Sequence, residues 1–144
     1  MPRIFGVNII AWLVSAIALY FVGFIVYGLL FSDLWVGLWG FTPEQLEAAA
    51  ASGGLSMAIG FVISLATALF IGIALKAFGA ATMKDALMRA LLLWAGFAVT
   101  TLAYDTVYAM QPVMLLILDA AHLLVGFLVV AAILTAMDKV AVKD

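Results

Sequence analysis

Four long apolar runs, separated by short polar segments, organise this chain. They cover approximately residues 4–30, 55–78, 84–110 and 113–137. Each run has roughly the length that a helix needs to cross a hydrocarbon core of about 30 Å. Because the connections are short, helices that follow each other in sequence are expected to be neighbours in space. The pattern predicts one all-α membrane domain, residues 1–144, folded as an antiparallel bundle of four transmembrane helices.

The connection between the first two runs carries its own signals. Trp35 and Trp39 lie close to Asp33, which is typical of an aromatic belt at the membrane interface. The residues at 42–45, Thr-Pro-Glu-Gln, combine a capping threonine, a proline at the first helical position and a glutamine three residues after the cap. We therefore expect a short amphipathic helix at the membrane interface, ending near Ala51.

The basic residues indicate how the chain is threaded through the membrane. They fall at three places: Arg3; Lys76, Lys84 and Arg89; and Lys139 and Lys143. Loops kept in the cytoplasm are enriched in Lys and Arg, so both termini are expected on the cytoplasmic side of a bacterial inner membrane. The first run is expected to be retained rather than cleaved, because Tyr27 to Phe31 follow it without a small-x-small cleavage site.

Composition supports a lipid environment and excludes several classes of function. Hydrophobic residues make up 69% of the chain and charged residues only 10%, which is too little polar surface for a soluble domain. The formal net charge of −2 and the scattered cations argue against nucleic acid as a partner. Cysteine is absent, so disulfides and thiolate metal ligands are excluded.

Small residues recur at every fourth position of the second run. They are Ser56, Gly60, Ser64, Ala68 and Gly72. A small-xxx-small series lets another helix approach closely. The partner of this face is either a helix of the same bundle or a helix of another protein, and the spacing alone is compatible with both.

Ionisable residues inside the runs are the candidates for chemistry, because they are costly in a membrane. Asp119 and His122 lie on one face of the fourth run, and Asp105 on the third lies at a similar depth, about 9 to 12 Å from the turn at Gln111-Pro112. The candidate polar site comprises Asp119, His122, Asp105, Thr101 and Tyr104. Asp119 and His122 either fix the helix register through hydrogen bonds or form a ligand or proton site.

Two further expectations concern metals and anchors. Di-metal carboxylate bundles need several Glu-x-x-His ligands, whereas this chain has one histidine. We therefore expect no metal and no cofactor. Tyr108 is expected to act with Trp35 and Trp39 as an interfacial anchor.

A family resemblance covers most of the chain. It rests on Asn8, on Gly23 to Phe31, on Trp35 and Gly40, and on the blocks Trp94 to Leu102, Pro112 and Asp119-Ala-Ala-His122-Leu-Leu. These features resemble the bacterial membrane family catalogued as domain of unknown function 1761 (DUF1761). The resemblance implies four helices and an asparagine-rich stretch followed by tyrosine near the end of the third. Here Tyr104-Asp105 stands in that region, and Asp119 stands where asparagine is expected.

Three classes of function are compatible with these observations. The first is a non-enzymatic accessory or structural subunit, docked on a larger membrane complex of respiratory or photosynthetic type, or a homo-oligomer. The alternative is a small proton- or cation-coupled transporter that uses Asp119, His122 and Asp105. An enzyme is the least favoured class, because the sequence has no nucleophile-base pair, phosphate loop or metal-ligand set.

Overall fold

The computed structural model describes residues 2–138 and is almost entirely helical. Its elements are β1 (Arg3–Ile4), β2 (Val7–Asn8), α1 (Ile9–Gly23), η1 (Phe24–Leu30), α2 (Ser32–Trp39), α3 (Pro43–Ala51), α4 (Gly53–Ala77), α5 (Met83–Leu93), η2 (Trp94–Val99), α6 (Thr100–Tyr108) and α7 (Val113–Asp138). Within this part of the chain four helices are long and apolar enough to cross a membrane: Ile9–Leu30, Gly53–Ala77, Met83–Tyr108 and Val113–Met137. The prediction of four helices of spanning length is confirmed.

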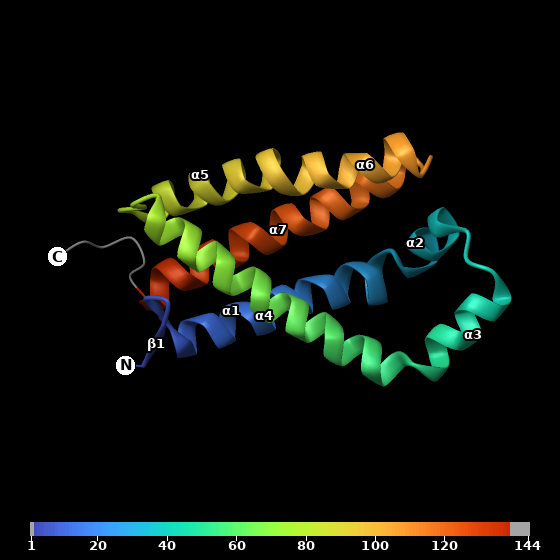
Figure 1. Cartoon of the computed structure of the whole chain (residues 1–144), viewed down its shortest axis with the longest axis horizontal. Helices are drawn as coiled ribbons and strands as arrows, with labels where there is room; N and C mark the ends of the chain where they lie inside the picture. The colour runs from blue at the N-terminus through green and yellow to red at the C-terminus, as the bar shows by residue number, and fades with distance from the viewer. Residues whose placement is uncertain (1, 139–144) are drawn as a thin grey trace.

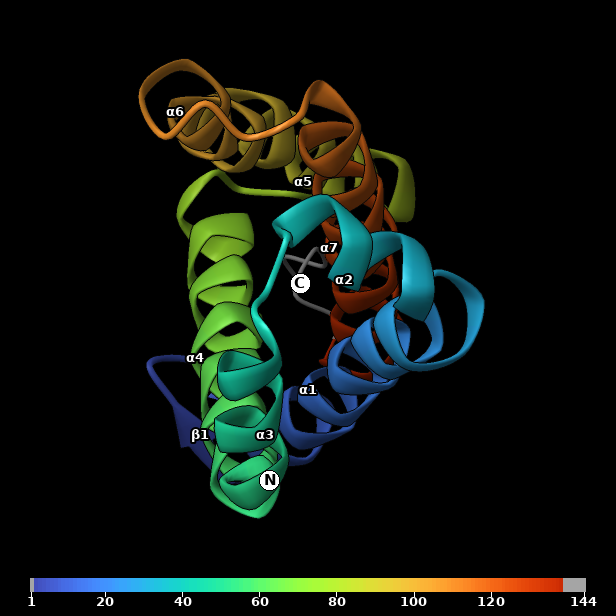
Figure 2. The same cartoon turned by 90° about the vertical axis from the view of Figure 1, so that its right-hand side faces the viewer.

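Consecutive spans run in opposite directions (Figure 1). α1 packs against both α4 and α7, and α7 in turn packs against α5. Contact is much weaker between α4 and α5, which leave an apolar groove of about 720 Å³ between them. The first span therefore packs closely against the second, and the third against the fourth, whereas the second and third spans make little contact. In the end-on view α4 lies apart from the α5–α6 span (Figure 2).

The first helix begins later than the predicted start at residue 4. Residues 3–8 instead form a small antiparallel hairpin in which Arg3 pairs with Asn8. Its two turn residues, Phe5 and Gly6, both have positive φ angles, 48° and 80°, as a tight two-residue hairpin requires. The side chain of Asn8 then accepts hydrogen bonds from the backbone N–H groups of Ile10 and Ala11, at 2.9 and 3.4 Å, and so caps α1.

The connection between the first two spans holds two helices instead of one. The predicted helix after Thr42 is confirmed as α3: the Thr42 hydroxyl accepts from the Gln45 N–H, and the Gln45 side chain accepts from the Thr42 N–H. Its position at a membrane interface stays a prediction. The additional helix, α2, contains Trp35 and Trp39 and ends at Gly40, whose φ angle is 65°.

Two spans contain a stretch of π-helix. These stretches are η1, which continues α1, and η2, which joins α5 to α6. π-Helical turns hold about one residue more than α-helical turns, because each N–H bonds five residues back. Since one residue corresponds to a rotation of about 100°, residues beyond such a stretch point in a different direction from that expected for a continuous α-helix.

The helices α1, α4 and α7 pack closely where they meet near the hairpin. Small side chains dominate there: Ala11, Ser15, Ala68 and Ala131 are essentially fully buried. At Gly72 of α4 a Cβ atom would lie 3.0 Å from Val7 Cγ2 and 3.2 Å from Leu134 Cδ1. A larger residue here would require the Val7 and Leu134 side chains to shift by a few tenths of an ångström, so the absence of a side chain at Gly72 permits the close approach.

Only part of the small-residue series of α4 takes part in this packing. Ser64, Ala68 and Gly72 are buried inside the bundle, whereas Gly60 is half-buried beside Tyr20 and Ser56 is exposed. Three of the five residues thus pack within the bundle. Docking of another protein on this face stays a prediction that the structure restricts to its exposed end.

The described basic residues lie at one end of the bundle. Arg3 is in β1, Lys76 is at the end of α4, and Lys84 and Arg89 are in α5 (Figure 1). Arg89 also braces the turn between α4 and α5, because its guanidinium group donates to the carbonyl oxygens of Phe78 and Gly79. Lys139 and Lys143, the remaining basic residues of the predicted topology, lie outside the described residues.

Replacing Gly72 by leucine is expected to destabilise the protein, because the side chain would be forced against Val7 and Leu134. Overpacking of this kind costs about 1 to 3 kcal/mol. Thermal unfolding of the purified protein in detergent measures the effect. The matched control is Gly96→Leu in η2, where a Cβ meets nothing within 4 Å. Equal unfolding temperatures for the two variants would contradict the close approach at Gly72.

Candidate functional site

A hydrogen bond between two spans forms the centre of the candidate site. The Tyr27 hydroxyl donates to Oδ1 of Asp119 over 2.6 Å, and the two residues are 92 positions apart in sequence. Tyr27 lies in the π-helical stretch η1 and Asp119 in the second turn of α7. Both side chains are partly buried. Asp119 is thus tied to the first span rather than to the third.

His122 lies one turn further along α7 and packs against the same tyrosine. The two rings meet edge to face, with centroids 4.8 Å apart and an interplanar angle of 66°. The imidazole also lies against Gly23, where a Cβ would come within 3.3 Å of Nε2. Among residues 2–138, neither imidazole nitrogen has a hydrogen-bond partner. Asp119 and His122 therefore contact Tyr27 from neighbouring turns but are not hydrogen-bonded to each other.

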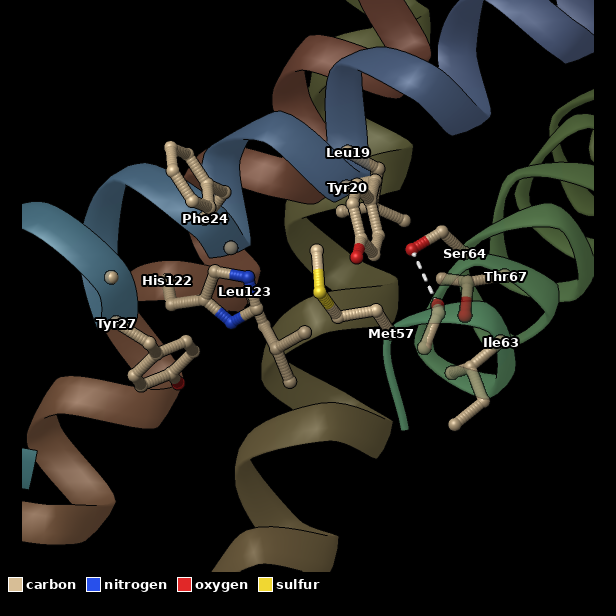
Figure 3. Close-up of a pocket in the computed structure, with 13 residues that line it drawn as sticks. Leu19, Tyr20, Phe24, Tyr27, Met57, Ile63, Ser64, Thr67, His122 and Leu123 are labelled. Carbon is tan, nitrogen blue, oxygen red and sulfur yellow. Dashed lines mark hydrogen bonds between the residues drawn. The ribbon is translucent and has the colours of Figure 1, made fainter. Parts of the chain in front are cut away.

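A cavity of about 500 Å³ adjoins this cluster. Its walls come from the α1–η1 span, the first half of α4 and the middle of α7, where His122 and Leu123 line it. Figure 3 shows the His122 ring and the Tyr20 hydroxyl facing this space, with Met57, Ser64 and Thr67 on the α4 side. Most of the lining is apolar, so the few polar groups stand out as the places where a ligand would be oriented.

An aromatic chain connects Tyr27 to the connection after the first span. The ring centroid of Tyr27 is 5.4 Å from that of Trp35. The Trp35 ring in turn lies 6.3 Å from the ring of Trp39 and 5.8 Å from that of Phe41, centroid to centroid. Trp39 and Phe41 are stacked at 5.8 Å. The indole N–H of Trp39 is buried and has no hydrogen-bond partner in the described part of the chain. The role of Trp35 and Trp39 as interfacial anchors stays a prediction.

The predicted site residues of the third span do not join the cluster around Tyr27. Thr101, Tyr104, Asp105 and Tyr108 are all exposed, and Tyr104 and Tyr108 stack on each other with centroids 5.6 Å apart. Asp105 is near enough to Asp119 for the two carboxyl groups to interact electrostatically, but no hydrogen bond joins them. The candidate site thus separates into an inner cluster and an outer face.

The π-helical stretch η2 explains this separation. Trp94, at its start, faces inward and donates its indole N–H to the Ala120 carbonyl oxygen over 2.7 Å. In an uninterrupted α-helix, residues 101, 105 and 108 would lie on the same face as Trp94. The wider turns between them and Trp94 rotate the rest of the span, which places Asp105 on the outside.

Tyr27 and Gly23 were not among the predicted site residues. Tyr27 supplies the hydroxyl that binds Asp119, and Gly23 leaves the room that His122 occupies. Both lie in the segment on which the family resemblance rests, but the hydrophobic pattern of that segment did not mark them as site residues. Among the described residues no group of three or more His, Asp or Glu side chains is placed to hold a metal ion; the expectation of no metal stays a prediction.

Comparison with known proteins identifies the family. A family model described as "Protein of unknown function (DUF1761)" matches residues 10–135, which is most of the chain. The chain belongs to the DUF1761 family. No curated protein and no solved structure was found to match it. Membership in DUF1761 confirms the resemblance seen in the sequence, and an activity has to be inferred from the site itself.

Replacing Tyr27 by phenylalanine is expected to destabilise this DUF1761 protein, because Asp119 loses its hydrogen bond. Side-chain hydrogen bonds inside membrane proteins are worth about 0.6 to 2 kcal/mol. A double-mutant cycle with Asp119→Leu, read by thermal unfolding in detergent, isolates the pair. We expect Tyr27→Phe to cost little in the Asp119→Leu background. Strictly additive effects would show that the hydrogen bond does not stabilise the fold.

Proposed function

We propose that this protein is a non-enzymatic accessory subunit that docks on a larger membrane complex through the outer face of its third span. The docking face is defined as Thr101, Tyr104, Asp105 and Tyr108. The proposal keeps the function expected from the sequence but moves the docking surface, because most of the small-residue series is already occupied inside the bundle.

The observation that carries the proposal is that the third span is the least apolar of the four and also the least buried. The most apolar 18-residue window of Met83–Tyr108 has a mean hydropathy of 1.6, against 2.5 for the corresponding window of each of the other three spans. It is also the least covered, with 11% of its most apolar window buried against 22% to 28% in the others. The least apolar helix therefore has the largest share of its surface facing outward, which favours a protein neighbour over lipid.

The spacing of the docking face supports the same conclusion. Its four residues follow the i, i+3, i+4, i+7 pattern of a single helix face. Asp105 lies about 9 Å from the turn at Gln111, at 1.5 Å per residue. A carboxylate at the centre of a span costs about 2.5 to 3.5 kcal/mol on insertion scales and less toward its end, and acidic residues within spans usually face protein. The stacked rings of Tyr104 and Tyr108 border a shallow groove of about 260 Å³ that a partner side chain could fill.

The proposed location is the inner membrane of a bacterium, with both termini in the cytoplasm. The described basic residues, Arg3, Lys76, Lys84 and Arg89, gather at the end of the bundle where the hairpin and the α4–α5 turn lie. An excess of Lys and Arg at one end favours that end as the cytoplasmic one. α2 and α3 would then lie on the opposite side, with the aromatic residues at the interface.

A second candidate function is a proton- or cation-coupled transporter. The specific observation in its favour is the Tyr27–Asp119 hydrogen bond beside His122, inside the membrane-spanning part and next to a cavity. Intramembrane acid and histidine residues are common elements of proton relays. Asp105, on the outer side of the neighbouring span, would be the next carboxyl group from Asp119.

Replacing Asp105 by leucine is expected to release the protein from its partner while preserving insertion, because leucine suits a lipid-facing position. Mild-detergent extraction of native membranes, size separation and mass spectrometry measure the effect. We expect the wild type to co-migrate with a larger complex at fixed stoichiometry, and Asp105→Leu and Tyr104→Leu to lose this association.

The matched control for the docking test is Phe21→Leu. Phe21 is 57% exposed, close to the 63% of Tyr104, but lies on α1. It should keep the partner. Migration of the wild type only as a monomer would contradict docking, whereas a homo-oligomer lost in Asp105→Leu would identify a second copy as the partner.

The transporter alternative predicts that Asp119→Asn and His122→Gln each abolish proton flux. The measurement uses purified protein in liposomes that contain a pH-sensitive dye, with a potassium diffusion potential as the driving force. Asp33→Asn, an exposed acid outside the spans, is the control and should behave like the wild type. Flux that persists in both site variants would remove Asp119 and His122 from any transport pathway.

A further inference from the structure

We infer that the cavity beside His122 binds a neutral lipophilic molecule whose carbonyl oxygen accepts a hydrogen bond from the imidazole. The ligand class that fits best is a quinone with an alkyl or prenyl chain. This site is separate from the docking face, since it lies between α1–η1, α4 and α7, and it does not depend on the proposed partner.

The unpartnered imidazole is the first argument. His122 is only partly exposed, yet neither ring nitrogen bonds to another residue between 2 and 138. The fully buried side-chain atoms that lack a partner in the described part of the chain belong to other residues, so the His122 nitrogens are accessible from the space that the ring faces, and an acceptor placed there can bond to them. The ring faces the cavity instead of a neighbouring helix (Figure 3). A molecule in the cavity would supply the missing acceptor.

The size and walls of the cavity are the second argument. Its volume of about 500 Å³ lies inside the range of about 300 to 1,000 Å³ that is typical of small-molecule sites. Leu19, Phe24, Met57, Ile63 and Leu123 make its walls largely apolar. Water alone would find few of the two to four polar partners that a buried water needs. Met57 and Ile63 are also exposed on the outside of α4, so the site opens toward the lipid phase.

The polar groups of the cavity favour a carbonyl compound. Tyr20 also presents its hydroxyl to the cavity, and this group has no hydrogen-bond partner among the described residues. Two donors, an imidazole N–H and a phenol O–H, suit a headgroup with two acceptor oxygens. Tyr20, Phe24 and Tyr27 add aromatic surface for a flat ring.

The nearby acid favours a neutral ligand over a fatty acid. Asp119 precedes His122 by one turn and is hydrogen-bonded to Tyr27, whose ring touches His122. A fatty acid would place a second carboxyl group beside Asp119, and two carboxylates repel each other when both are ionised, the more so at the low dielectric constant of the membrane. A quinone carbonyl avoids this repulsion and still accepts the hydrogen bond.

The test measures thermal stabilisation of the purified full-length chain in detergent by a benzoquinone that carries a ten-carbon alkyl chain. Binding to the folded state raises stability with ligand concentration, which yields an apparent Kd. Decylbenzene, which lacks carbonyl groups, and decanoate, which is anionic, are the comparison probes. We expect saturable binding of the quinone, with decylbenzene at least about fivefold weaker because it loses a hydrogen bond, and decanoate weaker because its carboxylate is repelled.

Two variants locate the probe in this cavity. His122→Leu removes the donor and should weaken quinone binding about fivefold to tenfold, while His122→Gln, which keeps an N–H donor, should restore part of the affinity. Gly60→Leu fills the cavity from α4, where a Cβ has ordinary space 3.6 Å from Tyr20. It should weaken both the quinone and decylbenzene. Phe70→Leu, in the groove between α4 and α5, should bind like the wild type.

Three results would overturn the inference. They are the absence of saturable quinone binding to the wild type, equal affinity for the quinone and decylbenzene, and tighter binding of decanoate than of the quinone. Unchanged quinone affinity in Gly60→Leu would also place the probe elsewhere. Because a Cβ at Gly60 meets no atom closer than 3.6 Å, Gly60→Leu is expected to fold and keeps the test decisive even where His122→Leu does not fold.

Discussion

The close approach of α1, α4 and α7 near the hairpin is the contact on which the rest of the structure depends. Lipid offers no hydrophobic drive for helices to associate, so the helices must pack by fitting closely together. Gly72, Ala68 and Ala131 allow this fit, and Val7 of the hairpin fills the remaining space. The indole N–H of Trp12 adds a hydrogen bond from α1 to the Leu65 carbonyl oxygen on α4, at 2.7 Å.

Beyond this contact the helices diverge, and the candidate site occupies the space that opens. α4 leaves α1 toward α3 (Figure 1), and the cavity lies between them. The π-helical stretch η1 carries Tyr27 in this wider half, where it reaches Asp119 on α7. π-Helical stretches are frequent at functional sites because they reorient side chains without breaking the helix. One end of the bundle therefore provides stability and the other provides room for a ligand.

The sequence predicted the spans far better than the directions of their side chains. Long apolar runs, the Thr42 cap and the Gln111-Pro112 turn located most helix ends, because those signals are local. The hairpin before α1 was missed because its residues read as part of an apolar run, although Asn8 is a good cap. The outward position of Asp105 was not predicted because the third span was treated as a continuous α-helix. No residue type in Trp94–Val99 indicates the π-helix found there. Tyr27 was missed because its partner lies 92 residues away.

The two polar regions of the membrane-spanning part call for different partners. His122 faces inward, where the surroundings are apolar side chains and only a molecule small enough for the cavity can reach it. Asp105 faces outward, where a whole helix of another protein can cover it together with Tyr104 and Tyr108. Because α7 contacts both the first and the third spans, it connects the two regions through Asp119. A ligand in the cavity and a partner on the outer face would therefore act on the same helix, which gives a physical route by which one could influence the other.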